Sequence, residues 1–271
     1  MSTLPTRRPS ATLAASAAIL VLIGSGAVLS LVWLPNDPLD FITDEPLAPA
    51  APGMWLGSDY LGRDVLARLL DGARITLFMA LSATLLAHLI GDTMGLLAAT
   101  RGGAVDAVLS RMVDVILSLP KIIVGLVVVA ALGTSAWVIV GVAAVVYSAG
   151  VFRIARALGS DLRRMDFITL ARSRGEGVGW ILFGEMLPHV IFPLATDFAI
   201  RTSFAILFMS SLSFVGLGVQ PPLSDWGGMV RENLGGLSTN PLAAIAPAVA
   251  IALVSIALNL LVDALGGGTG E

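Results

Sequence analysis

The chain alternates long apolar runs with shorter polar stretches. The first run, Pro9 to Asn36, has 28 residues without a charge, more than the roughly 7 to 15 apolar residues of a cleaved signal peptide. It predicts an uncleaved membrane span over residues 11–34. Because about 20 apolar residues cross a bilayer, the later runs predict five more spans, at residues 73–98, 107–131, 137–157, 191–214 and 242–265. We therefore expect an all-α polytopic membrane protein with six transmembrane helices.

The arginines predict the orientation of these spans, since short loops rich in Arg and Lys stay in the cytoplasm. With the N-terminus inside, three arginines fall outside: Arg63, Arg68 and Arg231. Nine fall inside: Arg7, Arg8, Arg101, Arg153, Arg156, Arg163, Arg164, Arg172 and Arg174. We expect cytoplasmic tails at residues 1–10 and 266–271, outer loops at 35–72 and 215–241, and an inner loop at 158–190. Residues 73–265 then form a five-helix core.

The first outer loop ends in a pattern typical of an amphipathic helix. Leu66, Leu69, Leu70 and Ala73 recur at i, i+3, i+4 and i+7, which is one helical face. Four charged residues share the other face or precede it: Asp59, Arg63, Asp64 and Arg68. We expect a short helix in the outer interface. It is either an elbow that leads into the second span or, through those four residues, a docking surface for an extracellular partner.

The inner loop, residues 158–190, is long for a connection between helices, and long ordered loops are often functional. Leu162, Met165 and Ile168 are spaced for a helix. Glycines at 175, 177 and 179 allow turns, and residues 180–187 predict a second short helix that ends near Pro188. The arginines of this loop suit docking to a cytoplasmic partner. The alternative is that they only follow the orientation rule and contact lipid headgroups.

Several ionisable residues fall inside or beside the spans, where they are costly and often functional. Asp197 and Arg201 stand at i, i+4 and can pair, either lining a path or gate or joining helices. His88 and Asp92 have the same spacing and predict a helix contact rather than a metal site, and Arg111 with Asp114 predicts a structural pair. Trp226 lies near a boundary, as an aromatic belt requires, with an outer gate as the alternative.

Composition narrows the classes of function. Apolar residues make up 56% of the chain and charged residues 13%, against about 25% charged in soluble domains, which argues against a soluble enzyme. The absence of cysteine excludes thiol chemistry. The single lysine, Lys121, follows Pro120, so the chain contains no phosphate-binding loop of the G-x-x-x-x-G-K-[ST] type. We expect no catalytic residue, metal or cofactor in this chain, and a net charge of −3 does not favour nucleic acid.

Four ordered blocks resemble the dipeptide, oligopeptide and nickel permeases of ABC importers. The blocks are GSDYLGRDVLARLLDGARITL (57–77), RMVDVILSLPKIIVGLVVVA (111–130), DFITLARSRGEGVGWILFGEMLPH (166–189) and SLSFVGLGVQPPLSDWGGMV (211–230). In the third, Ala171, Gly175, Leu187 and Pro188 match the family's coupling-loop pattern, E-A-A, three residues, G, nine residues, I-x-L-P. Thr169, Leu170 and Glu185 replace its Glu, first Ala and Ile. The resemblance assigns ATPase coupling to Thr169, Leu170, Ala171, Arg172, Gly175, Gly177, Leu187 and Pro188.

The resemblance implies a type I ABC importer permease in a bacterial inner membrane. This chain would pair with a second, related permease, two cytoplasmic ATPase subunits would bind ATP and Mg²⁺, and an extracytoplasmic binding protein would deliver the solute. Short peptides are the leading substrate, with nickel or metal chelates, glutathione-like and opine-like compounds as alternatives. A different class, an ion-coupled secondary transporter, would use Asp92, Asp197 and Arg201 as its relay.

Overall fold

The computed structural model describes residues 11–266, which form helices joined by loops, with only isolated β-bridges in place of strands. The two expected tails lie outside the described residues, apart from Gly266. Within this part of the chain, five helices are long and apolar enough to cross a membrane, or six if one bent pair counts as a span. Contacts divide the chain into two compact units, residues 1–76 with 222–271, and residues 77–221.

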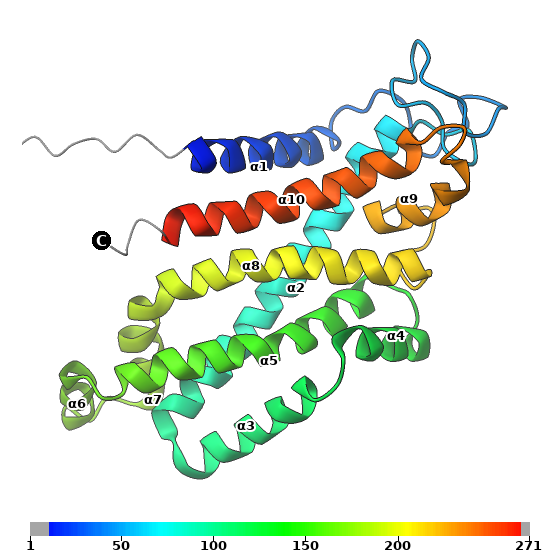
Figure 1. Cartoon of the computed structure of the whole chain (residues 1–271). Helices are drawn as coiled ribbons and strands as arrows, with labels where there is room; N and C mark the ends of the chain where they lie inside the picture. Colours follow the sequence, from blue (N-terminus) through cyan, green and yellow to red (C-terminus); the bar gives the residue numbers. More distant parts are fainter. Residues whose placement is uncertain (1–10, 267–271) are drawn as a thin grey trace, which may run out of the picture. The chain divides into compact units, whose positions relative to one another are not determined.

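The first unit is built around the two helices nearest the chain ends. Helix α1 (Ala11–Leu29) packs along α10 (Leu242–Gly266), and α10 also packs on α9 (Trp226–Asn233) (Figure 1). The 3₁₀ turn η2 (Leu234–Gly236) follows α9. Helix α1 ends at Leu29 rather than at residue 34, and residues 30–64 form a loop without a helix.

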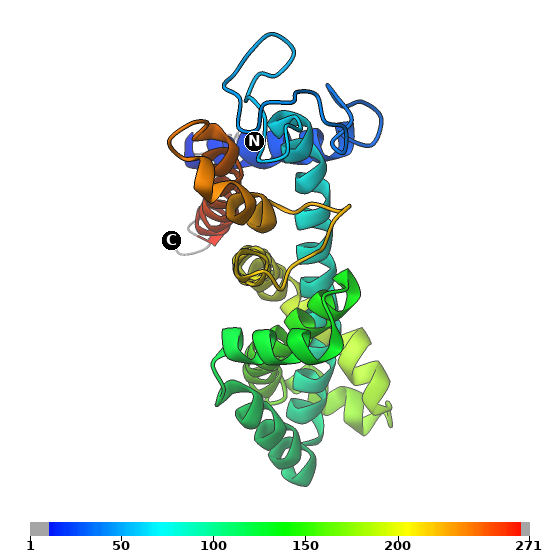
Figure 2. The ribbon, with the colours of Figure 1, turned by 90° about the vertical axis from the view of Figure 1, so that its right-hand side faces the viewer.

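The second unit surrounds α5 (Ala136–Leu162), which contacts α2 (Val65–Arg101) and three further helices. Those three are α3 (Gly103–Leu117), α4 (Lys121–Leu132) and α8 (Leu187–Val215). Figure 1 and Figure 2 show the ribbon from two directions at right angles. Two glycines of α2, Gly91 and Gly95, allow α5 to approach closely: a Cβ on Gly95 would lie 2.7 Å from the carbonyl oxygen of Phe152. Small residues at this spacing are typical of membrane helix contacts.

Helix α2 (Val65–Arg101) corrects the prediction of a separate interfacial helix and a second span. It is one continuous helix of 37 residues, about 55 Å long at 1.5 Å per residue. Nothing between Val65 and Arg101 breaks it, because the sequence there contains no proline. The predicted elbow is therefore the first part of a rod that exceeds the roughly 30 Å apolar core of a bilayer.

The predicted third span is broken rather than straight. Helices α3 and α4 meet at 85° across residues 118–120. Pro120 lacks an N–H and disfavours helical geometry at Leu119, so α3 ends at Leu117 and α4 begins at Lys121. The sequence pattern of apolar positions continues through this break, which is why it predicted one span.

The inner loop also differs from its prediction. Helix α6 (Asp166–Ser173) is separate, but α7 (Val178–Trp180), the π-helix η1 (Ile181–Met186) and α8 follow one another without a gap. Pro188 sits near the start of α8 and does not end a helix. Because a π-helical turn shifts the hydrogen-bond register, the missing N–H of Pro188 is accommodated within one long helical segment.

Candidate functional site

Helix α6 rests on the start of α8 through one apolar face. Ile168 and Ala171 are fully buried and belong to a cluster with Ile181 and Met186 of η1. The ring of Phe167 stacks on His189 of α8, with centroids 4.6 Å apart. This packing fixes α6 to the helical segment that leads into the membrane.

The opposite face of α6 is exposed and contains three of the residues that the resemblance assigned to ATPase coupling: Thr169, Leu170 and Arg172. Of the others, Ala171 is buried beneath this face, Leu187 is half-buried, and Gly175, Gly177 and Pro188 are exposed. Gly175 has φ +81°, which confirms the predicted turn, whereas Gly177 has φ −72° and Gly179 lies inside α7. Met165 caps α6 instead of continuing a helix from Leu162.

Two inner-loop arginines bind the end of α2. Arg163 donates to the carbonyl oxygen of Ala99 at 3.3 Å, and Arg172 donates to that of Thr100 at 3.0 Å. The last carbonyls of a helix lack partners within the helix and attract cations. The loop is therefore tied to α2 as well as to α8, a connection that no sequence spacing indicated.

A polar cluster joins α2 to α8 at the level of the predicted spans. Asp197 accepts a 2.5 Å hydrogen bond from Nε of Arg201, which confirms the predicted pair. His88 hydrogen-bonds Asp92 through Nδ1 at 3.1 Å, and its Nε2 lies 3.6 Å from Asp197. The two pairs expected separately thus form one cluster. Among the described residues, no three His, Asp or Glu side chains could hold a metal ion.

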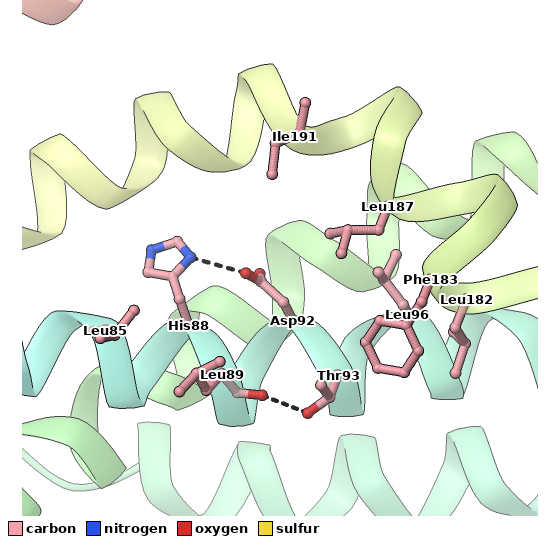
Figure 3. Close-up of a pocket in the computed structure, with 10 residues that line it drawn as sticks. All are labelled: Leu85, His88, Leu89, Asp92, Thr93, Leu96, Leu182, Phe183, Leu187 and Ile191. Atoms are coloured by element: carbon pink, nitrogen blue, oxygen red, sulfur yellow. Dashed lines mark hydrogen bonds and ion pairs between the residues drawn. The ribbon is translucent and has the colours of Figure 1, made fainter. Parts of the chain in front are cut away.

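This cluster borders an apolar cavity of about 230 Å³ between α2 and the segment from η1 into α8 (Figure 3). Leucines 85, 89, 96, 182 and 187 supply much of the wall, together with Phe183 and Ile191. Nε2 of His88 and Oδ1 of Asp92 are buried there without a hydrogen-bond partner. The cavity therefore has a largely apolar wall, to which His88 and Asp92 contribute the ionisable residues.

Arg111 and Asp114, predicted to be structural, do not pair with each other in the described residues. Asp114 accepts a 2.8 Å hydrogen bond from Arg153 of α5 instead, and Arg156 of the same helix makes two hydrogen bonds to Asp106. Both ion pairs join α3 to α5. Asp114 thus pairs with Arg153 of the neighbouring helix and not with Arg111, which lies one turn away on its own helix.

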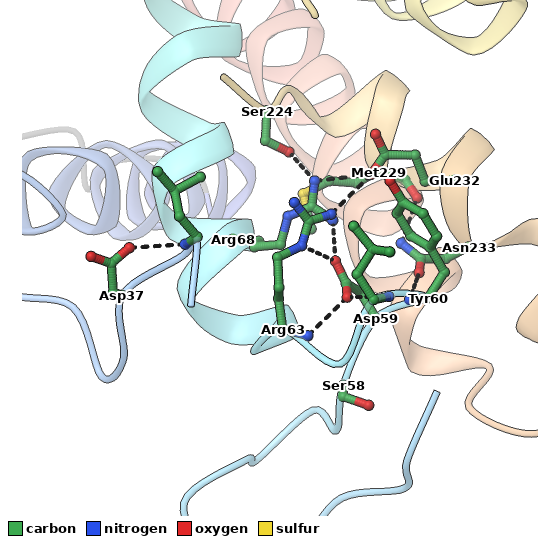
Figure 4. A network of polar contacts seen from close by, with 12 residues as sticks. Asp37, Ser58, Asp59, Tyr60, Arg63, Arg68, Ser224, Met229, Glu232 and Asn233 are labelled. Carbon is green, nitrogen blue, oxygen red and sulfur yellow. Dashed lines mark hydrogen bonds and ion pairs between the residues drawn. The ribbon is translucent and has the colours of Figure 1, made fainter. Parts of the chain in front are cut away.

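The four charged residues predicted as an outer docking surface are buried (Figure 4). Asp59 is inaccessible and accepts hydrogen bonds from Arg63 at 2.8 Å and Arg68 at 2.5 Å. Arg68 also donates to Ser224 and to Glu232 at 2.9 Å. Asp64 binds the side-chain amide of Asn36 at 2.7 Å. The charges are buried because they neutralise one another, which helical periodicity alone does not reveal.

Trp226, predicted near a membrane boundary, is buried within the protein. Its side chain is 1% exposed, its Nε1 donates to the carbonyl oxygen of Leu69, and its backbone N–H donates to Thr76. These bonds hold α9 against the first turns of α2. Four other tryptophans are exposed, as the aromatic belt predicts: Trp33, Trp55, Trp137 and Trp180.

Comparison with known proteins places this arrangement in a family. Residues 91–268 match the binding-protein-dependent transport system inner membrane components. The glutathione transport system permease protein GsiD of Pectobacterium atrosepticum is 39% identical over 213 residues, covering 78% of this chain and 70% of that protein. A putative peptide permease of Brucella ovis is 35% identical over 86% of this chain and 78% of its own length. The dipeptide transport system permease protein DppC of Haemophilus influenzae is 29% identical over 91% and 85%, respectively.

These matches confirm the resemblance that the sequence blocks indicated, since the family covers most of the chain. Each of the three relatives is named as a permease rather than as an enzyme. The family is one of inner membrane proteins, which agrees with the several apolar helices. The alternative of an ion-coupled secondary transporter loses its basis. The chain therefore belongs to the family of binding-protein-dependent transport system inner membrane components, as a multi-pass, non-catalytic permease subunit of an ABC importer.

Proposed function

We propose that this chain pairs with a second, related permease to enclose the path of a short, peptide-like solute. An extracytoplasmic binding protein delivers the solute, and two cytoplasmic ATPase subunits bind ATP with Mg²⁺ and drive transport. The names of the relatives support peptides and glutathione as the substrate class. Nickel, metal chelates and opine-like compounds remain the alternatives within the same importer type.

The exposed face of α6 is the observation that carries the ATPase part of this proposal. Leu170 is 59% exposed, while Ile168 and Ala171 beneath it are fully buried. A short helix that is fixed on one side and presents an apolar side chain on the other suits docking into a groove of a partner. Thr169 replaces the Glu of the family's coupling pattern, so the contact would depend on Leu170 and the arginines rather than on that carboxylate.

The contacts of α6 suggest how ATP binding would change the positions of α2 and α8. The stack of Phe167 on His189 joins α6 to α8, and Arg172 joins it to the end of α2. Movement of the docked ATPases would therefore reach both helices that form the polar cluster. In the proposed cycle, ATP-driven closure of the ATPase pair favours the outward-facing state, and hydrolysis releases it.

Substitution of the exposed leucine of α6 tests the docking directly. We expect L170D to insert normally but to recover far less ATPase subunit when the tagged permease is purified from membranes. The matched control is L223D, which changes another exposed leucine, in the loop predicted to lie outside, and should leave recovery unchanged. Equal recovery with L170D and the wild type would contradict docking through this face.

A further inference from the structure

The only lysine of the chain stands at an unusual place. Lys121 is the first residue of α4, and the rest of that helix, IIVGLVVVAAL, has no polar side chain. Its ammonium lies 4.9 Å from the ring centroid of Tyr147 on α5, which is a cation–π contact. No carboxylate forms an ion pair with it anywhere in residues 11–266.

A second cation lies on the same face of α5. The guanidinium of Arg201 approaches α5 at Gly150, where a Cβ would come within 2.6 Å of its terminal nitrogen. Tyr147 and Gly150 are three residues apart and share one helix face, separated by about 4.5 Å along the axis. Lys121 and Arg201 therefore occupy successive turns of one face of α5, reaching it from α4 and α8.

The two cations at this place differ in their partners. Arg201 pairs with Asp197, which His88 also approaches, whereas Lys121 is exposed and has no such partner. The hydroxyl of Tyr147 donates to the carbonyl oxygen of Phe204 and supplies no negative charge. A lysine in contact with hydrocarbon is strongly unfavourable, so the face that Lys121 shares with Arg201 must meet water or an anion.

We infer that Lys121, with Arg201 one turn away, binds a carboxylate of the solute during its passage. This inference rests on the proposed function, because it places the face in the transport path. Short peptides and glutathione share a free carboxylate, which the ammonium would attract as a point charge. Since Asp197 already holds Arg201, the ammonium of Lys121 is the cation left to attract a carboxylate, and a single attraction suits weak binding and release.

Two probes that differ only in that group test the inference. The importer, reconstituted in vesicles with its partners, would be given alanyl-alanine or its C-terminal amide. We expect K121M to lower uptake of the acid about tenfold relative to the amide, and K121R to restore most of the difference. R74M, which removes a cation paired with Asp71, is the control and should leave the ratio unchanged. Equal losses for both probes, as expected if a carboxylate of the second permease pairs with Lys121, would overturn the inference.

A second measurement separates this inference from the proposed function. Because Lys121 is the only lysine, its acetylation by an amine-reactive ester can be followed at one peptide by mass spectrometry of the purified importer. Both probes consume some ester through their own amino groups, so we expect alanyl-alanine to slow the modification of Lys121 more than the same concentration of the amide does. Protection in an importer that transports neither probe would support the carboxylate site and contradict peptide transport. Equal modification with both probes, with ATP hydrolysis intact, would contradict the site alone.

Discussion

At the scale of single residues, Asp59 is the most heavily bonded charge in the described chain. Its side chain is inaccessible and binds Arg63 and Arg68, and Oδ1 also accepts the backbone N–H groups of Leu61 and Arg63. Arg68 extends the network to Ser224 and Glu232 near α9. A buried carboxylate with this many partners fixes the loop before α2 to α9.

Removal of this carboxylate should destabilise the protein strongly. We expect D59A to lower the free energy of unfolding by about 3–5 kcal/mol, because it removes the fully buried anion of two buried guanidinium groups and leaves them only the partly exposed Glu232. Thermal unfolding of the purified permease in detergent measures this. E45A removes an exposed carboxylate from the same loop and should change stability by less than about 0.5 kcal/mol. Similar midpoints for the two variants would contradict the network.

The polar cluster of α2 and α8 predicts coupling between Asp197 and Arg201. R201M alone leaves Asp197 and Asp92 facing each other across His88, whereas D197N with R201M removes one charge of each sign. We therefore expect the double variant to lose less stability than the sum of the two single losses, by about 0.5–3 kcal/mol. A complete cycle of thermal unfolding and of uptake tests this, and additive losses would show that the pair is not coupled.

The charge exchange D197R with R201D gives a related test of function. The exchange keeps the pair but brings an arginine toward His88, which lies 3.6 Å from Asp197. We expect it to restore more uptake than either D197A or R201A, and less than the wild type. Uptake no better than with the single variants would count against pairing as the role of these residues.

At the scale of elements, the turn after α6 needs glycine because of its backbone conformation, not because neighbouring atoms leave no room for a side chain. Gly175 has φ +81°, and no neighbouring atom lies within 4 Å of where its Cβ would be. A valine there would be strained by about 1–3 kcal/mol, whereas asparagine tolerates this conformation. The chain therefore needs glycine or asparagine at this position to make the turn that follows α6.

Valine at position 175 should therefore uncouple the importer without preventing insertion. We expect G175V to reach the membrane at wild-type levels but to lose most solute-dependent ATP hydrolysis, and G175N to retain it. G179A, at a residue inside α7 where a Cβ would have no atom within 4 Å, serves as the control and should behave as the wild type. Full stimulation of hydrolysis with G175V would show that the turn does not position the ATPases.

The sequence predicted those elements that depend on a single local feature. Apolar runs predicted the spans, and Gly175 predicted its turn. The helix break at Pro120 and the continuous helix through Pro188 could not be predicted. A helix ends before Pro120, whereas a π-helical turn accommodates Pro188. The burial of Asp59 and Arg68 was hidden because Glu232, which Arg68 binds, lies 164 residues away in the sequence. Periodicity describes a face but not what covers it.

At the scale of the whole molecule, large apolar side chains remain exposed along most of the long helices. Examples are Val21 on α1, Leu85 on α2, Val145 on α5 and Phe204 on α8. A bilayer and a second permease together would cover such surfaces. The family match and these exposed faces both indicate that the functional unit is an assembly in the membrane.

The composition of that assembly is the most direct test of the account. The measurement is to tag the C-terminus, solubilise native membranes in mild detergent, and identify stoichiometric partners by mass spectrometry. We predict one related permease and two copies of ATPase subunit for each copy of this chain, with ATP hydrolysis that vanadate inhibits. Recovery of a lone chain or a homo-oligomer that transports solute without an ATPase would contradict the account.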